Sequence, residues 1–352
     1  MAEAWAQAAN DRPDRVRAFL AAHGWGGARR SPLAGDASFR RYERLEKPDG
    51  ARAMLMDAPP PKEDVRPFVA LARHLAALGF SAPRVLAEDA ALGALVLEDL
   101  GDDTFTRVLA QGGAERALYE LATDTLIALH RLPSVRAVPK GLAPYDHKKL
   151  LDEAMLLFDW YYPAVTGQRG SAQAQKEYVM AWLGPALSSL SELPPTLVLR
   201  DYHVDNLMIV SGRDGIARCG LLDFQDALEG PAAYDLMSLL EDARRDIAPE
   251  LANAMLARYL AAFPALDRTA FTGDFAILAA QRHAKVIGIF TRLCLRDGKP
   301  DYLIHIPRVW RLLERHLGHP ALGGLRDWLE RYLPPGRRAV PARELAGRGL
   351  IE

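Results

Sequence analysis

Apolar and polar positions alternate in two different ways along the chain. Before about residue 100, short apolar runs bounded by turns predict strands over 39–45, over 51–59 and at the start of 94–105. Two helices, over 11–22 and 62–79, are predicted in the same part. Beyond it, apolar residues recur at helical spacing over 118–129, 174–191, 230–246, 250–263, 270–297 and 301–319. The pattern predicts an α+β protein, with a small strand-rich part followed by a larger, mainly helical part.

Residues 197–225 return to short apolar runs inside the helical part. The first run ends at Arg200-Asp201, the second begins after Asn206, and the third ends at Asp223. The second and third runs enclose a turn rich in Gly and Asp, which predicts a hairpin. Loops at strand ends therefore present Asp201, Asn206 and Asp223.

The spacing of these three residues suits one kind of chemistry. Phosphoryl transfer from ATP requires an acceptor for the proton of the attacking hydroxyl and hard oxygen ligands for Mg²⁺. Protein kinases supply them as Arg-Asp, four residues, Asn, and a later Asp-Phe-Gly. In this chain Asp201 corresponds to the base, and Asn206 and Asp223 correspond to the metal ligands. Gln225 replaces the glycine of Asp-Phe-Gly. The alternative is three polar residues at turns of an ordinary sheet, but their joint occurrence favours a kinase-type site.

Upstream, the turn at 35–38 precedes a strand, which is typical both of a flap over ATP phosphates and of an ordinary hairpin. Kinases place a lysine on the third strand, but none stands there in this chain, so the phosphate cation stays open among Arg40, Arg41 and Arg52. Without that lysine, Glu63 is expected at the surface. The backbone at 98–100 is expected to meet adenine. The candidate nucleotide-binding residues are Gly35, Asp36, Ser38, Arg40, Glu98 and Leu100.

Composition narrows the class of partner. The 352 residues carry 44 Lys+Arg and 45 Asp+Glu, a formal net charge of −1, so neither nucleic acid nor an anionic membrane is expected as a partner. Cys219 and Cys294 lie in apolar surroundings without metal-ligand spacing and are expected buried and reduced. The sequence has no long apolar span and no signal-peptide pattern at its start, which predicts a cytoplasmic protein.

With these residues in place, the chain resembles the aminoglycoside-phosphotransferase/choline-kinase superfamily. Within it, the chain is most similar to the bacterial anomeric sugar kinases of cell-wall recycling, which phosphorylate the C1 hydroxyl of N-acetylmuramate and N-acetylglucosamine. One departure is visible, since Leu199-Arg200-Asp201 replaces the usual His-Gly-Asp of the superfamily. The sugar kinases share the Met-Asp-Ala-Pro-Pro segment, which stands where other kinases have the strand lysine, so the missing lysine agrees with the resemblance. The resemblance rests on GDASFRRY (35–42), MDAPP (56–60), LEDLGD (97–102), RDYHVDNLM (200–208), DFQDALEGPAAYDLMSLL (223–240) and QRHAKVIGIFTRL…RDGKP (281–300).

The resemblance implies a bilobal protein-kinase-like fold, with an N-lobe over 1–100, a C-lobe over 101–335 and a loosely packed tail over 336–352. It implies ATP and Mg²⁺, with a small amino sugar as acceptor. Asp205, Gln225 and Asp226 are candidates for binding sugar hydroxyls. An aminoglycoside or another small alcohol is an alternative acceptor, and a non-catalytic scaffold that binds nucleotide or a partner is an alternative of another class. The sequence is compatible with a monomer but does not fix the oligomeric state.

Overall fold

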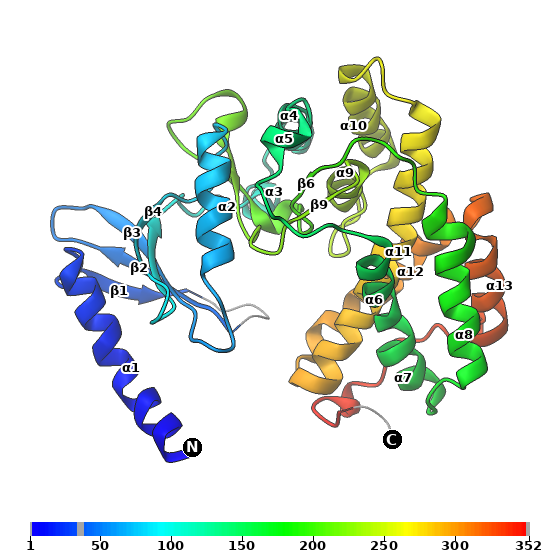
Figure 1. The fold of residues 1–352 in the computed structure, drawn as a ribbon, viewed down its shortest axis with the longest axis horizontal. Helices are drawn as coiled ribbons and strands as arrows, with labels where there is room; N and C mark the ends of the chain where they lie inside the picture. Colours follow the sequence, from blue (N-terminus) through cyan, green and yellow to red (C-terminus); the bar gives the residue numbers. More distant parts are fainter. Residues whose placement is uncertain (1, 34–38, 350–352) are drawn as a thin grey trace. The chain divides into compact units, whose positions relative to one another are not determined.

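The computed structural model describes residues 2–33 and 39–349 (Figure 1). The strands are β1 Arg29–Pro32, β2 Arg41–Glu46, β3 Arg52–Asp57, β4 Val85–Asp89, β5 Ala94–Glu98, β6 Thr196–Val198, β7 Leu207–Ile209, β8 Cys219–Leu221 and β9 Leu228–Gly230. The α-helices are α1 Ala2–Ala22, α2 Arg66–Ala77, α3 Phe105–Ala110, α4 Glu115–His130, α5 Ser134–Ala137, α6 His147–Leu156, α7 Tyr162–Thr166, α8 Ala172–Ala181, α9 Ala233–Leu240, α10 Pro249–Ala262, α11 Arg268–Asp297, α12 Ile306–His316 and α13 Gly323–Tyr332.

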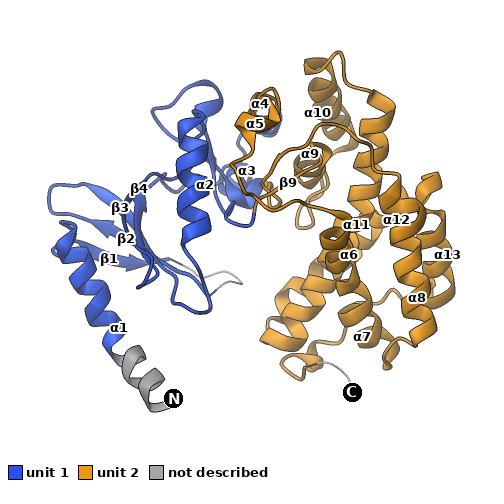
Figure 2. Ribbon diagram, viewed as in Figure 1, with its two compact units in different colours: residues 1–122, 204–226 blue, residues 123–203, 227–352 orange. Residues whose placement is uncertain are grey.

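The chain divides into two compact units (Figure 2). Unit 1 comprises residues 1–122 and 204–226, and unit 2 comprises 123–203 and 227–352. Residues 197–225 are therefore divided between the units, because the part up to His203 belongs to unit 2 and the hairpin that follows belongs to unit 1.

Unit 1 is built on a five-stranded antiparallel sheet in the order β1-β2-β3-β5-β4. Helix α1 lies beside this sheet (Figure 1) and contributes Val16, Phe19 and Leu20, at the spacing of one helix face, to the core. From the strands, this core takes in Leu45, Ala53, Leu55 and Val96 among others. The predicted helix over 11–22 begins earlier, at Ala2, because an alanine-rich segment precedes it.

Unit 2 is organised around α11, which packs against α6, α9 and α12. Gly288 makes the crossing with α6 possible, because a Cβ atom there would lie 2.2 Å from the backbone carbon of Leu156. At the C-terminal end of α11, the backbone N–H groups of Gly347 and Gly349 donate to the carbonyls of Cys294 and Leu295 at 3.0 and 2.9 Å.

The predicted division into strand-rich and helical parts is confirmed, as is the hairpin, which is the antiparallel pair β7–β8. Both cysteines are buried free thiols, as expected. Thr104 caps α3 with its side chain, and Asp102 pairs with Arg44 at 2.8 Å. Among the described residues, no helix has the length and apolarity to span a membrane.

Candidate functional site

The β7–β8 hairpin places the two candidate metal ligands side by side. Asn206 directly precedes β7, and its backbone carbonyl accepts a hydrogen bond from Leu222 N at 2.9 Å. Asp223 is the next residue along, and its carboxylate is 46 % exposed. Its φ of 56° lies in the left-handed region, which is uncommon for a non-glycine residue and occurs at turns and at functional sites. The side-chain oxygens of Asn206 and Asp223 are the hard donors that suit Mg²⁺.

Arg40 connects Asp223 with a second carboxylate. Its Nε lies 3.1 Å from Oε2 of Glu63, and its Nη1 lies 3.3 Å from Oδ1 of Asp223. The Arg40 and Glu63 side chains are only 12 % and 16 % exposed. The expectation that Glu63 is a surface residue is therefore wrong, because Arg40 supplies the cationic partner that a strand lysine supplies elsewhere. Arg52 instead pairs with Glu46 at 3.5 Å.

The residues that follow Asp223 are anchored in the same unit. The buried ring of Phe224 stacks on Phe68 of α2, with ring centroids 5.0 Å apart. The Gln225 amide donates to Asp223 at 2.9 Å and to Asp226 at 3.2 Å. The Asp205 carboxylate accepts a hydrogen bond from the hydroxyl of Thr106 on α3. Gln225, Asp226 and Asp205 remain candidates for binding sugar hydroxyls.

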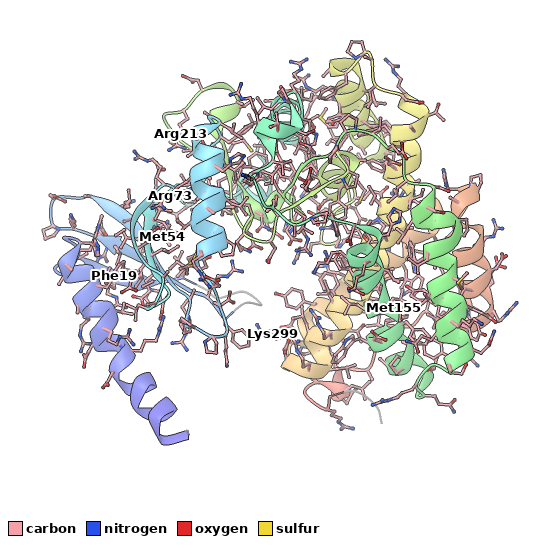
Figure 3. All side chains as sticks on the ribbon, viewed as in Figure 1. Phe19, Met54, Arg73, Met155, Arg213 and Lys299 are labelled. Carbon is pink, nitrogen blue, oxygen red and sulfur yellow. The ribbon has the colours of Figure 1, made fainter. Side chains whose placement is uncertain are left out.

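The segment expected at adenine lies at the end of β5. The Glu98 carboxylate forms ion pairs with Arg84 at 3.2 Å and with Arg213 at 2.5 Å; Figure 3 labels Arg213. Leu100 is buried in an apolar cluster with Met208 and Val210 of the hairpin region, against which Leu222 packs. This cluster offers an apolar surface against which an adenine ring could pack. The other nucleotide-binding candidates, Gly35, Asp36 and Ser38, lie outside the described residues.

In unit 2, Asp201 sits on a loop that a buried carboxylate holds in place. The Asp235 carboxylate accepts backbone hydrogen bonds from Leu199 at 2.6 Å and from Arg200 at 2.9 Å, the two residues before Asp201. Asp235 stands at the start of the helix predicted over 230–246, a position that suits either a helix cap or a brace of this loop. Its two hydrogen bonds show the brace. Burial raises the pKa of Asp235 to about 7, although both hydrogen bonds lower it. Arg200, with φ 71°, is again a left-handed non-glycine residue.

A buried ionic network surrounds the same loop. Glu153 of α6 forms ion pairs with Arg200 and with Lys285 of α11, the latter at 3.0 Å, and accepts a hydrogen bond from the hydroxyl of Tyr145. The Glu153 and Lys285 side chains are each 9 % exposed. Burial would raise the pKa of Glu153, but Lys285 and Arg200 outweigh it, so this pKa is lowered.

Two buried cations of α11 also act on Asp201 itself. Burial raises the pKa of Asp201, but nearby positive charges, above all those of Lys285 and Arg282, lower it more. The pKa of Asp201 is therefore below its ordinary value. Asp201 is therefore ionised at neutral pH. The sequence pattern alone assigns no role to Glu153, Arg282 or Lys285. The last two lie in the segment 281–300 that carries part of the family resemblance, which was the one available signal.

His203 follows Asp201 closely in sequence and is buried. Burial lowers the pKa of His203, so its ring is neutral at pH 7. Arg244 Nη1 lies 3.4 Å from its Nε2, in agreement with a ring that braces the loop.

A second group of ligand-type side chains lies on α11, α12 and the end of α9. Glu241 Oε2 is 2.7 Å from His283 Nε2, and Glu241 Oε1 is 2.9 Å from His316 Nε2. All three potential ligand atoms lie within 4.8 Å of one another. Hydrogen bonds from both rings to one carboxylate account for this geometry, and they help to lower the pKa of Glu241 to about 2 against the effect of burial.

The aromatic residues of 152–165 could form core or the wall of a sugar pocket. Tyr161 is fully buried and donates to the carbonyl of Ala339 at 2.7 Å. Tyr162 stacks on Phe158 and packs against Trp328. These contacts favour a core role for both tyrosines.

Comparison with known proteins decides the family. Residues 29–271 match the phosphotransferase enzyme family. The chain belongs to this family. Two relatives, from Caulobacter vibrioides and Pseudomonas aeruginosa, are each named N-acetylmuramate/N-acetylglucosamine kinase. The first is 40 % identical, over 92 % of this chain and 98 % of the relative, and the second is 39 % identical, over 91 % and 94 %.

Solved structures of proteins with other names share the fold. A gentamicin complex of the aminoglycoside phosphotransferase APH(2")-IIa matches with a TM-score of 0.56 at 15 % identity, over 88 % of this chain and 97 % of that one. A choline/ethanolamine kinase family protein from Mesorhizobium loti matches with a TM-score of 0.55 at 17 % identity, over 91 % and 99 %. These likenesses confirm the protein-kinase-like fold class.

Proposed function

We propose that the chain is an ATP-dependent kinase that phosphorylates the anomeric C1 hydroxyl of N-acetylmuramate, N-acetylglucosamine or both, in the salvage of cell-wall sugars. The observation that carries the proposal is the identity of about two residues in five, over nearly the whole chain, with two kinases of that name. The Asp201, Asn206 and Asp223 set supports it, because phosphoryl transfer needs a base and oxygen ligands at this spacing. An amino-sugar salvage kinase would work in the cytoplasm, where ATP is supplied.

Asn206 and Asp223 would hold Mg²⁺, since they offer hard oxygen donors and the hairpin brings them together. A bound Mg²⁺ supplies charge neutralisation at the transferred phosphoryl group and the leaving oxygen. Arg40, held between Glu63 and Asp223, is the candidate cation for the ATP phosphates. The apolar cluster of Leu100, Met208 and Val210 is the candidate contact for adenine.

Asp201 would orient the C1 hydroxyl and accept its proton. A carboxylate with a lowered pKa is a weak base, which suits a reaction in which the proton leaves late and positioning does most of the work. An anomeric hydroxyl is more acidic than an ordinary alcohol, so a weak base suffices. Asp235 and Glu153 would fix the Asp201 loop through Leu199 and Arg200.

The test is an assay of the purified protein with Mg-ATP and each sugar, with phosphorus NMR of the product. We expect a new phosphorus signal coupled to the anomeric proton. Asp201→Asn should lower kcat by about 10²- to 10⁴-fold, while Asp214→Asn, on the exposed turn of the hairpin, should leave it unchanged.

Each other outcome removes a defined part of the proposal. A phosphate elsewhere on the ring would overturn the anomeric assignment. No product from either sugar, together with phosphorylation in a panel of aminoglycosides and small alcohols, would overturn the sugar assignment. An Asp201→Asn variant with full biological activity would favour a non-catalytic scaffold.

A further inference from the structure

Helix α11 carries a stripe of four cations that begins beside the candidate base. Arg282, Lys285, Arg292 and Arg296 lie within about 80° of one another around the axis of a helix with 3.6 residues per turn. Arg282 and Lys285 are buried and their charges act on Asp201, whereas Arg292 is half-buried and Arg296 is exposed. From the sequence, the charged residues of 288–300 are expected to lie mostly on a solvated face, which holds for Arg296 but not for Arg292.

The partners of these cations differ. Lys285 pairs with Glu153 at 3.0 Å, and Arg296 forms a two-pronged pair with Asp297 at 2.7 and 2.8 Å. Among the residues that the structure describes, Arg292 forms no ion pair, and its buried Nε has no hydrogen-bond partner. Leaving a guanidinium nitrogen out of water and unbonded costs free energy. A side chain placed in this way is suited to an anion that arrives from solution.

Burial lowers the pKa of Arg292, and the charge of Arg296 lowers it further. Asp297 acts in the opposite direction, but its two oxygens are already bonded to Arg296. An added carboxylate would therefore relieve both the burial and the repulsion between the two arginines. A planar guanidinium suits a carboxylate because it can donate two parallel hydrogen bonds.

The position of Arg292 relates this anion site to the reaction. Arg292 follows Lys285 by seven residues, which places it on the same side of α11, two turns further and about 10 Å along the axis. Lys285 acts on Asp201, the candidate acceptor of the proton from the C1 hydroxyl. That spacing corresponds to the length of one substituted sugar. An acceptor with its hydroxyl at Asp201 could thus extend an acidic substituent toward Arg292.

We propose that Arg292 binds the carboxylate of the acceptor sugar, which is the lactyl group of N-acetylmuramate. This inference rests on the proposed function and deepens it by assigning the residue that recognises the acidic substituent. N-acetylglucosamine has no such group, so its phosphorylation does not depend on Arg292. Arg292 is accordingly a specificity-determining residue for one of the two sugars.

The experiment compares wild type, Arg292→Gln, Arg292→Lys and Arg296→Gln in steady-state assays with both sugars and with the methyl ester of N-acetylmuramate. Loss of a charge-assisted pair should lower kcat/KM of Arg292→Gln for N-acetylmuramate at least about tenfold, mainly through KM. Its kcat/KM for N-acetylglucosamine and for the neutral ester should stay within about twofold of wild type. Arg292→Lys should recover part of the loss. Arg296→Gln, the matched control on the same helix face, should change neither sugar by more than about twofold.

The outcomes separate this inference from the proposed function. Wild-type activity on both sugars with an equal loss for both in Arg292→Gln would overturn the inference and assign Arg292 a structural role. An unchanged KM for N-acetylmuramate would overturn it as well. If wild type phosphorylated neither sugar, the proposed function would fail first and the inference with it. Thermal unfolding of each variant checks that the fold is retained.

Discussion

Nη1 of Arg40 lies 3.3 Å from Oδ1 of Asp223, although the two residues are 183 positions apart in the sequence. The same guanidinium contacts Glu63 through its Nε. One cation therefore stands between a carboxylate that precedes α2 and the candidate metal ligand. Protein kinases use a strand lysine and a helix glutamate for the comparable pair. In this chain the cation is an arginine that directly precedes β2.

Replacement of Arg40 by Gln should weaken ATP binding. A charge-assisted hydrogen bond contributes about 1.5–3 kcal/mol, so the KM for ATP should rise at least about tenfold, while the KM for the sugar changes little. Arg41→Gln is the matched control, because Arg41 is the next residue and is exposed. Initial-rate measurements over a range of ATP concentrations give the KM for ATP of both variants. Equal KM values for the two variants would remove Arg40 from the nucleotide site.

The ionisation of Asp235 should make stability depend on pH. Its pKa is about 7 in the folded protein and about 3.9 in the unfolded chain. Between these values the folded state keeps a proton that the unfolded state has released, so this group's contribution to the free energy of unfolding falls as pH rises from about 4 to about 7. Asp235→Asn lacks this titration.

Urea unfolding of wild type and Asp235→Asn, from about pH 5 to about pH 8, measures this effect. The free energy of unfolding of wild type minus that of Asp235→Asn should fall with rising pH and become constant above about pH 7. A constant difference throughout would mean that Asp235 stays ionised, held by the N–H groups of Leu199 and Arg200.

Some residues of the site are placed by local sequence, and others are placed only by the packing of distant segments. Asn206 and Asp223 could be predicted because an apolar run on each side of a turn specifies a hairpin. The two partners of Arg40, Glu63 and Asp223, could not be predicted, because only the packing of distant segments brings them to it. The role of Glu153 could not be predicted for the same reason, because the sequence of its helix is equally compatible with an acidic residue at the surface. Only the packing of α6 on α11 buries it beside Lys285.

Removal of the Asp223 carboxylate should change the metal requirement. Asp223→Asn keeps the shape of the side chain but replaces a charged oxygen ligand by a neutral one, so the Mg²⁺ concentration for half-maximal activity should rise at least about tenfold. Asp214→Asn, on the exposed turn between β7 and β8, serves as the control. Titration of activity with Mg²⁺ at saturating nucleotide measures the shift. An unchanged requirement would exclude Asp223 as a ligand.

Glu153 should be essential for stability, in contrast to its neighbour Asp152. Glu153 is 9 % exposed and neutralises two buried cations, Arg200 and Lys285, so Glu153→Gln leaves both without their carboxylate and should cost about 3–5 kcal/mol. Asp152 is 55 % exposed and, within the described part of the chain, pairs only with Lys148 on the helix surface, so Asp152→Asn should cost less than about 1 kcal/mol. Chemical unfolding of both variants measures the difference in the free energy of unfolding.

A double variant tests the same charge balance. Adding Lys285→Met to Glu153→Gln should restore part of the lost stability, because it removes one of the two cations that Glu153 neutralises. Equal costs for the two single variants, or a further loss in the double variant, would contradict a charge-balancing role for Glu153.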